Sequence, residues 1–266
     1  MKDITSRDNQ WIKAACALKQ KKGRWEAHRF FAEGFRIISD AIHVGVTDGV
    51  CFVSPKGQSH PGFSQLEAAG EKLGWEFFAV TEAVYDKLKD TKNPQGLAAM
   101  LPFLPHSLAS LQGLDPKRPV LYLEAIQDPG NLGTIVRTAE GAGVNGIIMS
   151  ADCVDIYNPK TIRSTMGSVY RMPFCYAEEL PKAIEKIKQA GIHTYAAHLL
   201  GEHDYDQEDY RGSCAFFIGN EGNGLREEIA KAAQTYVKIP MSGQVESLNA
   251  AIAASVLMFE VRRQRK

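Results

Sequence analysis

Apolar runs of strand length alternate with helical periods in the second half of the chain. The apolar runs are expected to be strands and lie at residues 119–126, 146–151, 193–200 and 214–219. The helical periods lie at residues 131–142, 160–167, 181–190 and 224–233. Elements that alternate in this way form right-handed βαβ units around a mainly parallel sheet, whose ligand crevice lies at the carboxyl ends of the strands. We therefore expect an α/β fold.

The first half predicts a smaller α/β unit. A helix is expected over residues 3–21, with an apolar face formed by Ile4, Trp11, Ala14, Ala15 and Leu18. A short strand then runs into a helix at Glu33. The further elements are a helix near 61–74 and strands at 49–54, 75–80 and 96–103. Residues 104–119 contain prolines and no clear period, as linkers do. The predicted domains are residues 1–105 and 117–266.

Residues 239–260 join a polar loop directly to an apolar helix. Ser247 and Asn249 suit the start of this helix, because their side-chain oxygens can accept hydrogen bonds from the free N–H groups of the first turn. The helix is expected to be buried over most of its circumference, through Ala250, Ile252, Ala253, Val256, Leu257 and Phe259. Its preceding loop is then held rigidly, as a ligand-binding loop needs to be.

Two further loops have the same arrangement of apolar strand, tight polar turn and helix. The first has turn residues 128–131 before a helix that carries Arg137 and Glu140, and the second has the Gly/Asn-rich residues 219–224. A single junction of this kind is usually only a βα connection. Three of them in one chain indicate a functional site.

The three loops together are similar to those of the SpoU/TrmH family of RNA ribose methyltransferases, in the SPOUT class. In the first loop the matching residues are Asn131, Gly133, Arg137, Thr138 and Ala139. In the second loop they are Ile218, Gly219, Asn220, Glu221, Gly222, Gly224 and Leu225. In the third loop they are Ile239, Pro240, Met241, Gly243, Ser247, Leu248 and Asn249. Three motifs in the order and spacing of the family argue against a chance match.

The resemblance implies a fold and a cofactor. SPOUT domains thread their C-terminal segment through a loop to form a deep trefoil knot, although the general rules for chain connections argue against knots. The implied cofactor is S-adenosylmethionine, with Gly219 allowing close backbone approach and Ile239, Met241 and Leu248 completing the pocket. Residues 28–42 resemble the start of the L30e-like RNA substrate-binding domain that precedes the catalytic domain in many family members.

The same resemblance implies the catalytic residues. Arg137 resembles the family's catalytic arginine, proposed to receive the ribose 2′-hydroxyl proton. A charged guanidinium has no free lone pair, so we favour a role in which Arg137 fixes an RNA phosphate and stabilises the developing alkoxide. The alternative is a surface ion pair with Glu140. The family positions that orient the loops and the reacting groups are matched by Asn131, Glu221, Ser247 and Asn249. Of these, Ser247 or Asn249 is alternatively only a helix cap.

Charge is unevenly distributed, although the formal net charge is zero. Residues 1–36 hold nine Lys/Arg against four Asp/Glu, a local excess of five. Residues 158–171 carry Lys160, Arg163 and Arg171 without an acid, which favours phosphate binding. Arg163 also matches a basic family position that faces RNA. The predicted RNA-binding residues are Arg36, Lys160 and Arg163, although basic runs are as often solvated surface.

Other features argue against different classes of protein. The glycines within residues 219–224 follow GxxGxG and not the dinucleotide-binding GxGxxG, and no GxxxxGK[ST] phosphate loop occurs. The three histidines between residues 193 and 203 recur every five residues, which fits neither one helix face nor one strand face, so no metal site is predicted. Five scattered cysteines without a CxxC pair and the lack of a signal peptide or an apolar run of 18 residues predict a cytoplasmic protein without membrane contact.

The predicted function is S-adenosylmethionine-dependent 2′-O-ribose methylation of RNA. The favoured substrate is 23S ribosomal RNA, because enzymes with an L30e-like domain often act on large-subunit RNA. The alternatives are a tRNA 2′-O-methyltransferase and a catalytically silent RNA-binding or ribosome assembly factor, and the complete set of catalytic residues favours an enzyme. A homodimer is also predicted, since family members assemble through the knot region.

Overall fold

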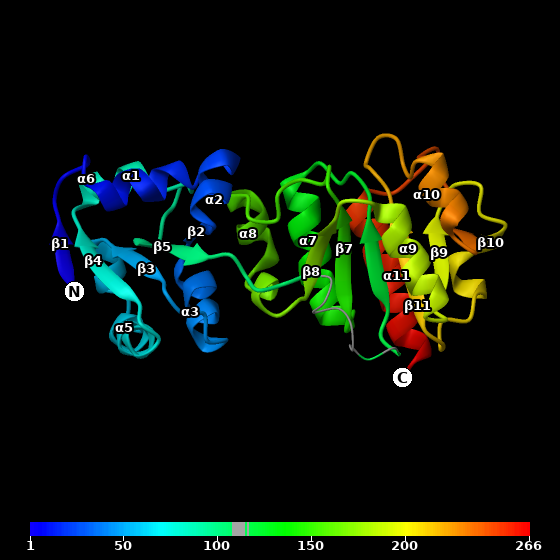
Figure 1. Cartoon of the computed structure of the whole chain (residues 1–266), viewed down its shortest axis with the longest axis horizontal. Coiled ribbons are helices and arrows are strands. Elements are labelled where there is room, and N and C mark those ends of the chain that lie inside the picture. The colour runs from blue at the N-terminus through cyan, green and yellow to red at the C-terminus, as the bar shows by residue number, and fades with distance from the viewer. Residues whose placement is uncertain (108–114, 116) are drawn as a thin grey trace. The chain divides into compact units, whose positions relative to one another are not determined.

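The computed structural model describes the chain except for residues 108–114 and 116 (Figure 1). It divides into two compact units. Unit 1 comprises Met1–Pro105 and Asp155–Tyr170, and unit 2 comprises His106–Val154 and Arg171–Lys266. Unit 1 therefore combines two separate stretches of the chain, which a contiguous division at residues 105 and 117 does not anticipate. The linker expected at residues 104–119 lies partly outside the described residues.

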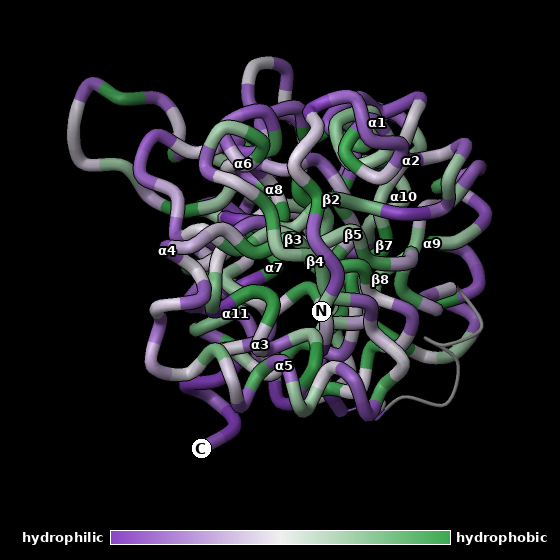
Figure 2. The backbone as a smooth tube through the Cα atoms, turned by 90° about the vertical axis from the view of Figure 1, so that its left-hand side faces the viewer, coloured by the Kyte–Doolittle hydropathy of each residue, from purple (hydrophilic) through white to green (hydrophobic). Residues whose placement is uncertain are grey.

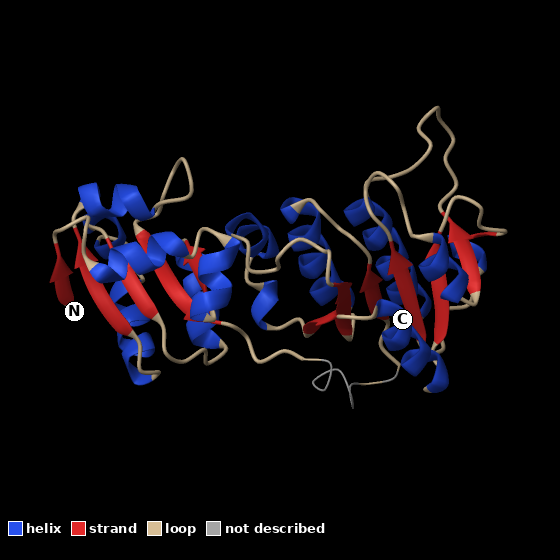
Figure 3. Ribbon diagram, turned by 45° about the horizontal axis from the view of Figure 1, so that its top comes forward, coloured by secondary structure: helices blue, strands red, loops and turns tan. Residues whose placement is uncertain are grey.

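Unit 1 is built on a five-stranded mixed sheet with the order β1-β4-β3-β5-β2 (Figure 3). The strands are β1 (Lys2–Ile4), β2 (Arg29–Glu33), β3 (Val50–Val53), β4 (Glu76–Val80) and β5 (Leu97–Pro102). The helices are α1 (Gln10–Ala17), α2 (Lys21–Ala27), α3 (Phe35–His43), α4 (Pro55–Gln58), α5 (Phe63–Lys72), α6 (Glu82–Leu88) and α8 (Pro159–Thr165). β1, β4 and β3 run parallel, whereas β5 is antiparallel to both of its neighbours. The apolar pattern predicts the later strands correctly but not α6.

The helix expected over residues 3–21 is wrong in its first part. Residues 2–4 form β1, which pairs with β4, and α1 begins only at Gln10. Asn9 fixes this start, because its side-chain oxygen accepts a hydrogen bond from Trp11 N at 2.8 Å. Along α1, Ile12 is buried, whereas Ala14, which was expected to face inward, is exposed.

The segment Asp155–Tyr170 is held in unit 1 by a buried ion pair and by aromatic packing. The side chains of Arg24 and Asp155 are both buried, and their charged groups lie 2.7 Å apart. The ring of Tyr157 stacks on Phe103 with 4.1 Å between the ring centroids. Loss of either charge would leave the other buried without a partner, so the pair fixes the segment to unit 1.

Unit 2 is built on a seven-stranded sheet with the order β10-β12-β9-β11-β6-β7-β8. The strands are β6 (Val120–Leu123), β7 (Gly146–Ser150), β8 (Phe174–Ala177), β9 (His193–Ala197), β10 (His203–Asp204), β11 (Cys214–Ile218) and β12 (Thr235–Lys238). The helices are α7 (Pro129–Ala142), α9 (Leu180–Gln189), α10 (Glu227–Ala232) and α11 (Ala250–Gln264). All the described strand pairs are parallel, which confirms the predicted parallel sheet. Strands β7 and β11 are buried along their whole length. Figure 2 shows the hydropathy of each residue along the chain. The trefoil knot stays a prediction.

Helix α11 is less enclosed than its sequence predicts. Its buried residues include Leu257 and Met258, and the helix packs against α7 and β11. Ile252 and Phe259, which were expected to be buried, are 50% and 49% exposed. The helix is apolar over most of its circumference, but the other elements of the same chain cover only part of that surface. Because the two exposed residues are seven positions apart, they form an apolar stripe on one face.

Candidate active site

Three loops leave the carboxyl ends of the strands in unit 2. The first covers residues 124–128 after β6, the second covers residues 219–226 after β11, and the third precedes α11 at residues 239–249. β6 and β11 are neighbours in the sheet, but the chain continues from β6 to β7 on one side and from β11 to β12 on the other. The strand order reverses between these two loops, which is where open α/β sheets bind their ligands.

Three of the predicted catalytic side chains form one chain of hydrogen bonds. Asn249 Nδ2 donates to Asn131 Oδ1 at 3.0 Å, and Asn131 Nδ2 donates to Glu221 Oε1 at 2.9 Å. Asn249 is also the N-cap of α11, because its Oδ1 accepts a hydrogen bond from Ala251 N at 2.9 Å. Asn249 and Glu221 come from the third and second loops, and Asn131 lies in the first turn of α7, so the three loops are tied together.

Glu221 acts in this network as an ionised carboxylate. Its two oxygens also accept hydrogen bonds from the backbone N–H groups of Gln127 and Asp128, each at 3.1 Å. Burial alone would raise the pKa of Glu221, but the hydrogen bonds from Asn131 and the backbone together outweigh it and hold the pKa below the ordinary carboxyl value. At neutral pH Glu221 is therefore an anchor for the first loop and not a proton donor.

Asn220 closes the second loop. Its Oδ1 accepts a hydrogen bond from Gly222 N at 2.8 Å, and its Nδ2 donates to Ala125 O in the first loop at 2.7 Å. A Cβ atom on Gly219 would lie 2.2 Å from the backbone of Gly224, so only glycine fits there. The resemblance explains Gly219 by close approach of the cofactor, whereas the structure explains it by close approach of the loop's own backbone.

Ala125 has a left-handed backbone conformation with φ of 52°. This region is unfavourable for a residue that has a Cβ atom. Its N–H donates to Ser150 Oγ at 2.9 Å, and its carbonyl accepts from Asn220 and from Gln127 Nε2, the latter at 3.1 Å. Gln127 Nε2 also donates to Asp152 O at 2.8 Å. Of these residues, only Asn220 belongs to a sequence motif, because no pattern in a single sequence marks a non-glycine residue as left-handed.

A cavity of about 280 Å³ lies between the second and third loops. Its lining includes all the predicted cofactor residues, namely Gly219, Ile239, Met241 and Leu248. Ser247 lines it with an exposed side chain, and His198 and Leu199, which the sequence motifs do not assign to the cofactor site, line it from the end of β9. Apolar side chains such as Leu225 and polar ones such as Asn220 line the same cavity, and this mixture suits a purine ring and its polar edge. The residues present therefore fit the implied cofactor.

Arg137 lies on α7, two turns after the start of the helix, and is exposed. The alternative ion pair with Glu140 is absent, because Glu140 instead pairs with Arg171 and accepts two hydrogen bonds from it. Among the described residues, no hydrogen bond or ion pair of Arg137 is found. Its guanidinium is therefore available to an external anion such as a phosphate.

The predicted RNA-binding residues all lie in unit 1. Arg36 is exposed on α3, and Lys160 and Arg163 lie on α8. The inference that Arg163 has no acidic neighbour is wrong, because Arg163 forms an ion pair with Asp90 in the loop after α6. About a third of the Arg163 side chain is still exposed. Its contact with RNA stays a prediction.

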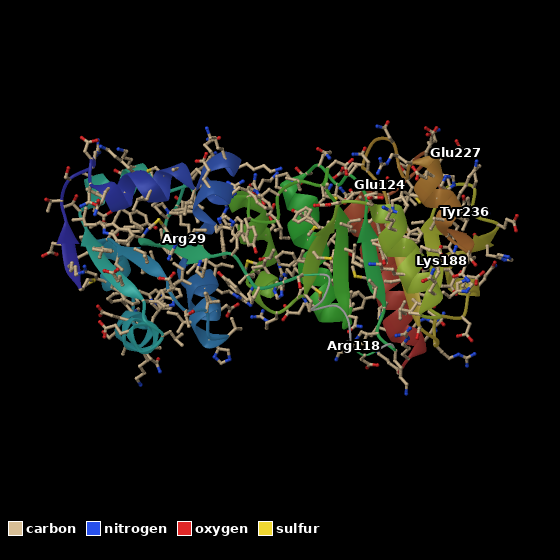
Figure 4. All side chains as sticks on the ribbon, viewed as in Figure 1. Arg29, Arg118, Glu124, Lys188, Glu227 and Tyr236 are labelled. Atoms are coloured by element: carbon tan, nitrogen blue, oxygen red, sulfur yellow. The ribbon has the colours of Figure 1, made fainter. Side chains whose placement is uncertain are left out.

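A buried carboxylate joins the end of β6 to the start of α10. Glu124, which is labelled in Figure 4, is 1% exposed and accepts a hydrogen bond from Arg226 N at 2.8 Å. Arg226 Nε forms an ion pair with the same carboxylate. The hydrogen bond from the Arg226 backbone N–H fixes the end of the second loop against the first. This bond does not depend on the position of the exposed Arg226 side chain. Sequence reasoning did not identify this pair.

The part of the chain that the structure describes contains no cluster of His, Cys, Asp and Glu that could hold a metal ion. His193 Nε2 lies 2.8 Å from Thr235 Oγ1, and His198 Nδ1 accepts a hydrogen bond from Leu200 N. These histidines therefore have protein partners. The same described residues form no helix with the length and apolar character of a membrane span.

Comparison with known proteins covers both units. Residues 118–259 match the SpoU rRNA Methylase family, and residues 9–99 match the MRM3-like substrate binding domain. The 23S rRNA (guanosine(2553)-2′-O)-methyltransferase RlmP of Bacillus subtilis is 31% identical over 98% of this chain and 100% of its own. An uncharacterized tRNA/rRNA methyltransferase of Synechocystis is 33% identical over 98% of this chain and 94% of its own.

Solved structures give the same result. An AdoMet-bound rRNA methyltransferase from Sinorhizobium meliloti is 33% identical, with a TM-score of 0.87 over 98% of this chain and 97% of its own. An RNA 2′-O ribose methyltransferase is also 33% identical, with a TM-score of 0.83 over 99% of each chain. The L30e-like character of unit 1 stays a prediction. The family match spans more than half of the sequence, and this chain belongs to the SpoU rRNA methylase family of S-adenosylmethionine-dependent RNA 2′-O-ribose methyltransferases.

Proposed function

We propose that this enzyme methylates a ribose 2′-hydroxyl of 23S ribosomal RNA, and that unit 1 binds the RNA while unit 2 catalyses the reaction. The observation that carries the proposal is the hydrogen-bond chain from Asn249 through Asn131 to Glu221, which joins the three loops and ends at a residue that lines the cavity. The Bacillus subtilis relative, whose name gives a 23S rRNA substrate, aligns with both units.

A tRNA substrate is the second candidate. A solved structure whose title names methylation of tRNA matches this chain at 26% identity over 97% of its own length but only 56% of this chain. That protein therefore has no counterpart to nearly half of the present chain. Because residues 9–99 match a substrate-binding domain, the additional half favours ribosomal RNA over tRNA.

The cofactor residues belong to the second and third loops. S-adenosylmethionine supplies the methyl group when it is bound. The apolar side chains of Ile239, Met241 and Leu248 would cover the purine, and the backbone around Gly219 would contact its polar edge. The close packing at Gly219 keeps this part of the lining rigid, so little conformational freedom is lost on binding.

Arg137 would bind an RNA phosphate and stabilise the negative charge that develops on the ribose oxygen. A guanidinium keeps its proton at neutral pH, so the hydroxyl proton leaves late and to water. Asn131 would orient the substrate. Its Oδ1 accepts from Asn249 and one of its amide hydrogens goes to Glu221, which leaves the second amide hydrogen for the ribose or a phosphate. Ser247 would contribute a hydroxyl from the edge of the cavity.

We further propose a cytoplasmic homodimer. The exposed stripe of Ile252 and Phe259 on α11 is the kind of surface that a second copy covers. The cysteines are free, and burial raises the pKa of Cys175 and Cys214 to about 11. Protonated, unpaired thiols are compatible with a reducing compartment.

Methyl transfer to purified RNA tests the substrate. The full chain would be incubated with labelled S-adenosylmethionine and either a 23S rRNA transcript or bulk tRNA. We expect label in the 23S transcript, and we expect one ribose methylation to be missing from RNA of a strain that lacks the gene. Label in tRNA alone would overturn the substrate assignment. Tight RNA binding without methyl transfer to any RNA would instead support the silent assembly factor.

A further inference from the structure

A ladder of aromatic rings in unit 1 ends at an exposed tryptophan. Trp25 on α2 is 44% exposed, although tryptophan is on average a highly buried residue. Its ring and that of Phe103 form a T-shaped pair, with 5.4 Å between centroids and an interplanar angle of 77°. Phe103 stacks on Tyr157, which stacks on Phe30 in β2 with centroids 5.0 Å apart. The core of unit 1 therefore supports the Trp25 ring and leaves nearly half of the residue free.

The helix that carries this tryptophan is held firmly. Arg24, the residue before Trp25, is buried and pairs with Asp155 at 2.7 Å. A Cβ atom on Gly23 would lie 2.3 Å from Ala17 O, so glycine allows α2 to pack closely against the end of α1. Trp25 is therefore preorganised and loses little conformational freedom when a ligand binds.

Positive charge lies beside the exposed ring. Lys21 and Lys22 precede Trp25 by four and three residues, which places all three on one face of α2, and both lysines are exposed. Glu26 offsets this charge only in part, because it lies 3.7 Å from Lys22 in a pair that is largely exposed to solvent. An aromatic plane next to ammonium groups fits a nucleobase and its flanking phosphates better than it fits an apolar protein surface.

We propose that Trp25, Lys21 and Lys22 form a stacking site for an unpaired base of the substrate RNA. The inference rests on the proposed function, since it takes RNA as the substrate, and it adds the site on unit 1 and the kind of RNA that the site selects. A base can stack on a side chain only when it is not enclosed in a duplex. The site therefore selects RNA with a loop, a bulge or a single-stranded end.

Tryptophan fluorescence of the full-length protein tests this site. Of the three tryptophans, Trp75 is buried and Trp11 is partly buried against Phe78, so a base can stack on Trp25 far more readily than on the others. We expect a hairpin from 23S rRNA with a single-stranded loop to quench the fluorescence, and a fully paired duplex of equal length to quench it much less. The quench should disappear in Trp25→Phe. A quench that persists in Trp25→Phe overturns the proposal.

Binding affinities give an independent measure. Trp25→Ala should weaken binding of the hairpin by about 5- to 100-fold, as expected for the loss of one base stack, and Trp25→Phe should weaken it less. Replacement of Lys21 and Lys22 by glutamine should reduce the slope of log Kd against log salt by roughly 1 to 2. Val44→Ala is the control for an exposed apolar side chain, and Lys13→Gln with Lys72→Gln is the control for two exposed charges on unit 1. Both controls should bind the hairpin as the unaltered protein does.

The outcomes separate this site from the proposed function. Unchanged hairpin affinity and methylation in Trp25→Ala would overturn the stacking site and leave the enzyme assignment intact. If the unaltered protein methylates no RNA, the proposed function fails instead. A change in mass by light scattering in Trp25→Ala, without a change in RNA affinity, would identify a protein contact and overturn the RNA site.

Discussion

Among single residues, Arg137 gives the sharpest test of catalysis, because Glu140 is occupied by Arg171 and leaves the Arg137 guanidinium exposed. Arg137→Ala should lower turnover by about 10²-fold or more, which is the scale for loss of one preorganised charge beside a developing oxyanion. Affinity for S-adenosylmethionine should stay nearly unchanged, since Arg137 does not line the cavity. Single-turnover methylation and calorimetry measure the two effects. Arg262→Ala, which removes an exposed arginine from the last turn of α11, is the control.

Arg137→Lys separates the two roles considered for this residue. Lysine keeps the charge, loses the planar fork and has a pKa low enough to release a proton. If Arg137 holds a phosphate through its fork, Lys should be nearly as poor as Ala at every pH, which is the result that we expect. Substantial rescue with a shifted pH profile would instead support a base. Full turnover in both variants would remove Arg137 from the site.

Glu221 predicts a pH dependence. Its folded-state pKa is depressed, so its contribution to stability is fully present above the carboxyl pKa of the unfolded chain and is lost as the pH falls through the lower folded-state value. The midpoint of thermal unfolding should therefore be lower for Glu221→Gln than for the unaltered protein at pH 7. The difference should shrink as the solution becomes strongly acidic. A difference that is constant over the acidic range would mean that Glu221 is not the titrating group.

At the scale of the elements, the site depends on how the first and second loops are held together. Asn220→Asp keeps the oxygen that accepts from Gly222 N but loses the N–H that donates to Ala125 O. Turnover should fall by about 10-fold, because a carbonyl without its donor costs on the order of 1–3 kcal/mol. Addition of Ala125→Gly should restore part of the activity. Glycine adopts φ of 52° without the strain that a Cβ atom causes, so the first loop then depends less on the hydrogen bond from Asn220.

The control for Asn220→Asp is Asn145→Asp, at the opposite end of the same sheet. Asn145 Nδ2 donates to Asp115 O at 2.9 Å, so the variant loses a comparable, partly buried bond far from the cavity. It should lower the unfolding temperature and leave turnover per folded molecule unchanged. Equal loss of turnover in Asn145→Asp and Asn220→Asp would mean that both act through stability alone.

Periodicity predicts the elements of this fold better than it predicts their exposure. Strands β2 to β7, β9 and β11 and the helix α7 follow from apolar runs and turn residues, because burial on a pleated or helical surface imposes a period. Strands β1, β8, β10 and β12 are not predicted by the pattern. Short elements such as β1 and β10 contain too few residues for a period to be recognised. The pattern predicts that Ile252 and Phe259 are buried, whereas both are exposed, because a single sequence does not distinguish a core face from a face that another molecule covers.

At the site, local motifs predict some of the contacts, whereas contacts between residues far apart in the sequence are not predicted. The motifs predict that Asn131, Glu221 and Asn249 come together, and hydrogen bonds join them. The support of the first loop by Ser150, and the pairing of Glu124 with Arg226, depend on contacts between distant strands, and no spacing along the chain encodes them. Arg163 pairs with Asp90, which lies 73 positions away, so the sequence around Arg163 does not reveal this acid.

At the scale of the whole molecule, the exposed stripe on α11 predicts self-association. Large apolar side chains that lie together on one face favour burial, and α11 is already anchored on α7, so a second copy can cover the stripe without unfolding it. Light scattering at micromolar concentration should give twice the mass of one chain. A symmetric interface contains each residue twice, so one substitution changes both sides of the contact.

Ile252→Lys with Phe259→Lys should therefore convert the protein to a monomer, because it places four ammonium groups in the dimer interface. The exposed position of both residues means that the monomer itself should keep its fold, which circular dichroism would verify. Val44→Lys, at a residue that is 38% exposed in unit 1, makes the same kind of change away from α11 and should leave the mass unchanged.

If residues of both copies are needed for the site, the variant that has half the mass should also lose methylation activity. A monomer with full activity would show that one chain contains the whole site. An unaltered protein that already scatters as a monomer and is active would contradict the dimer itself.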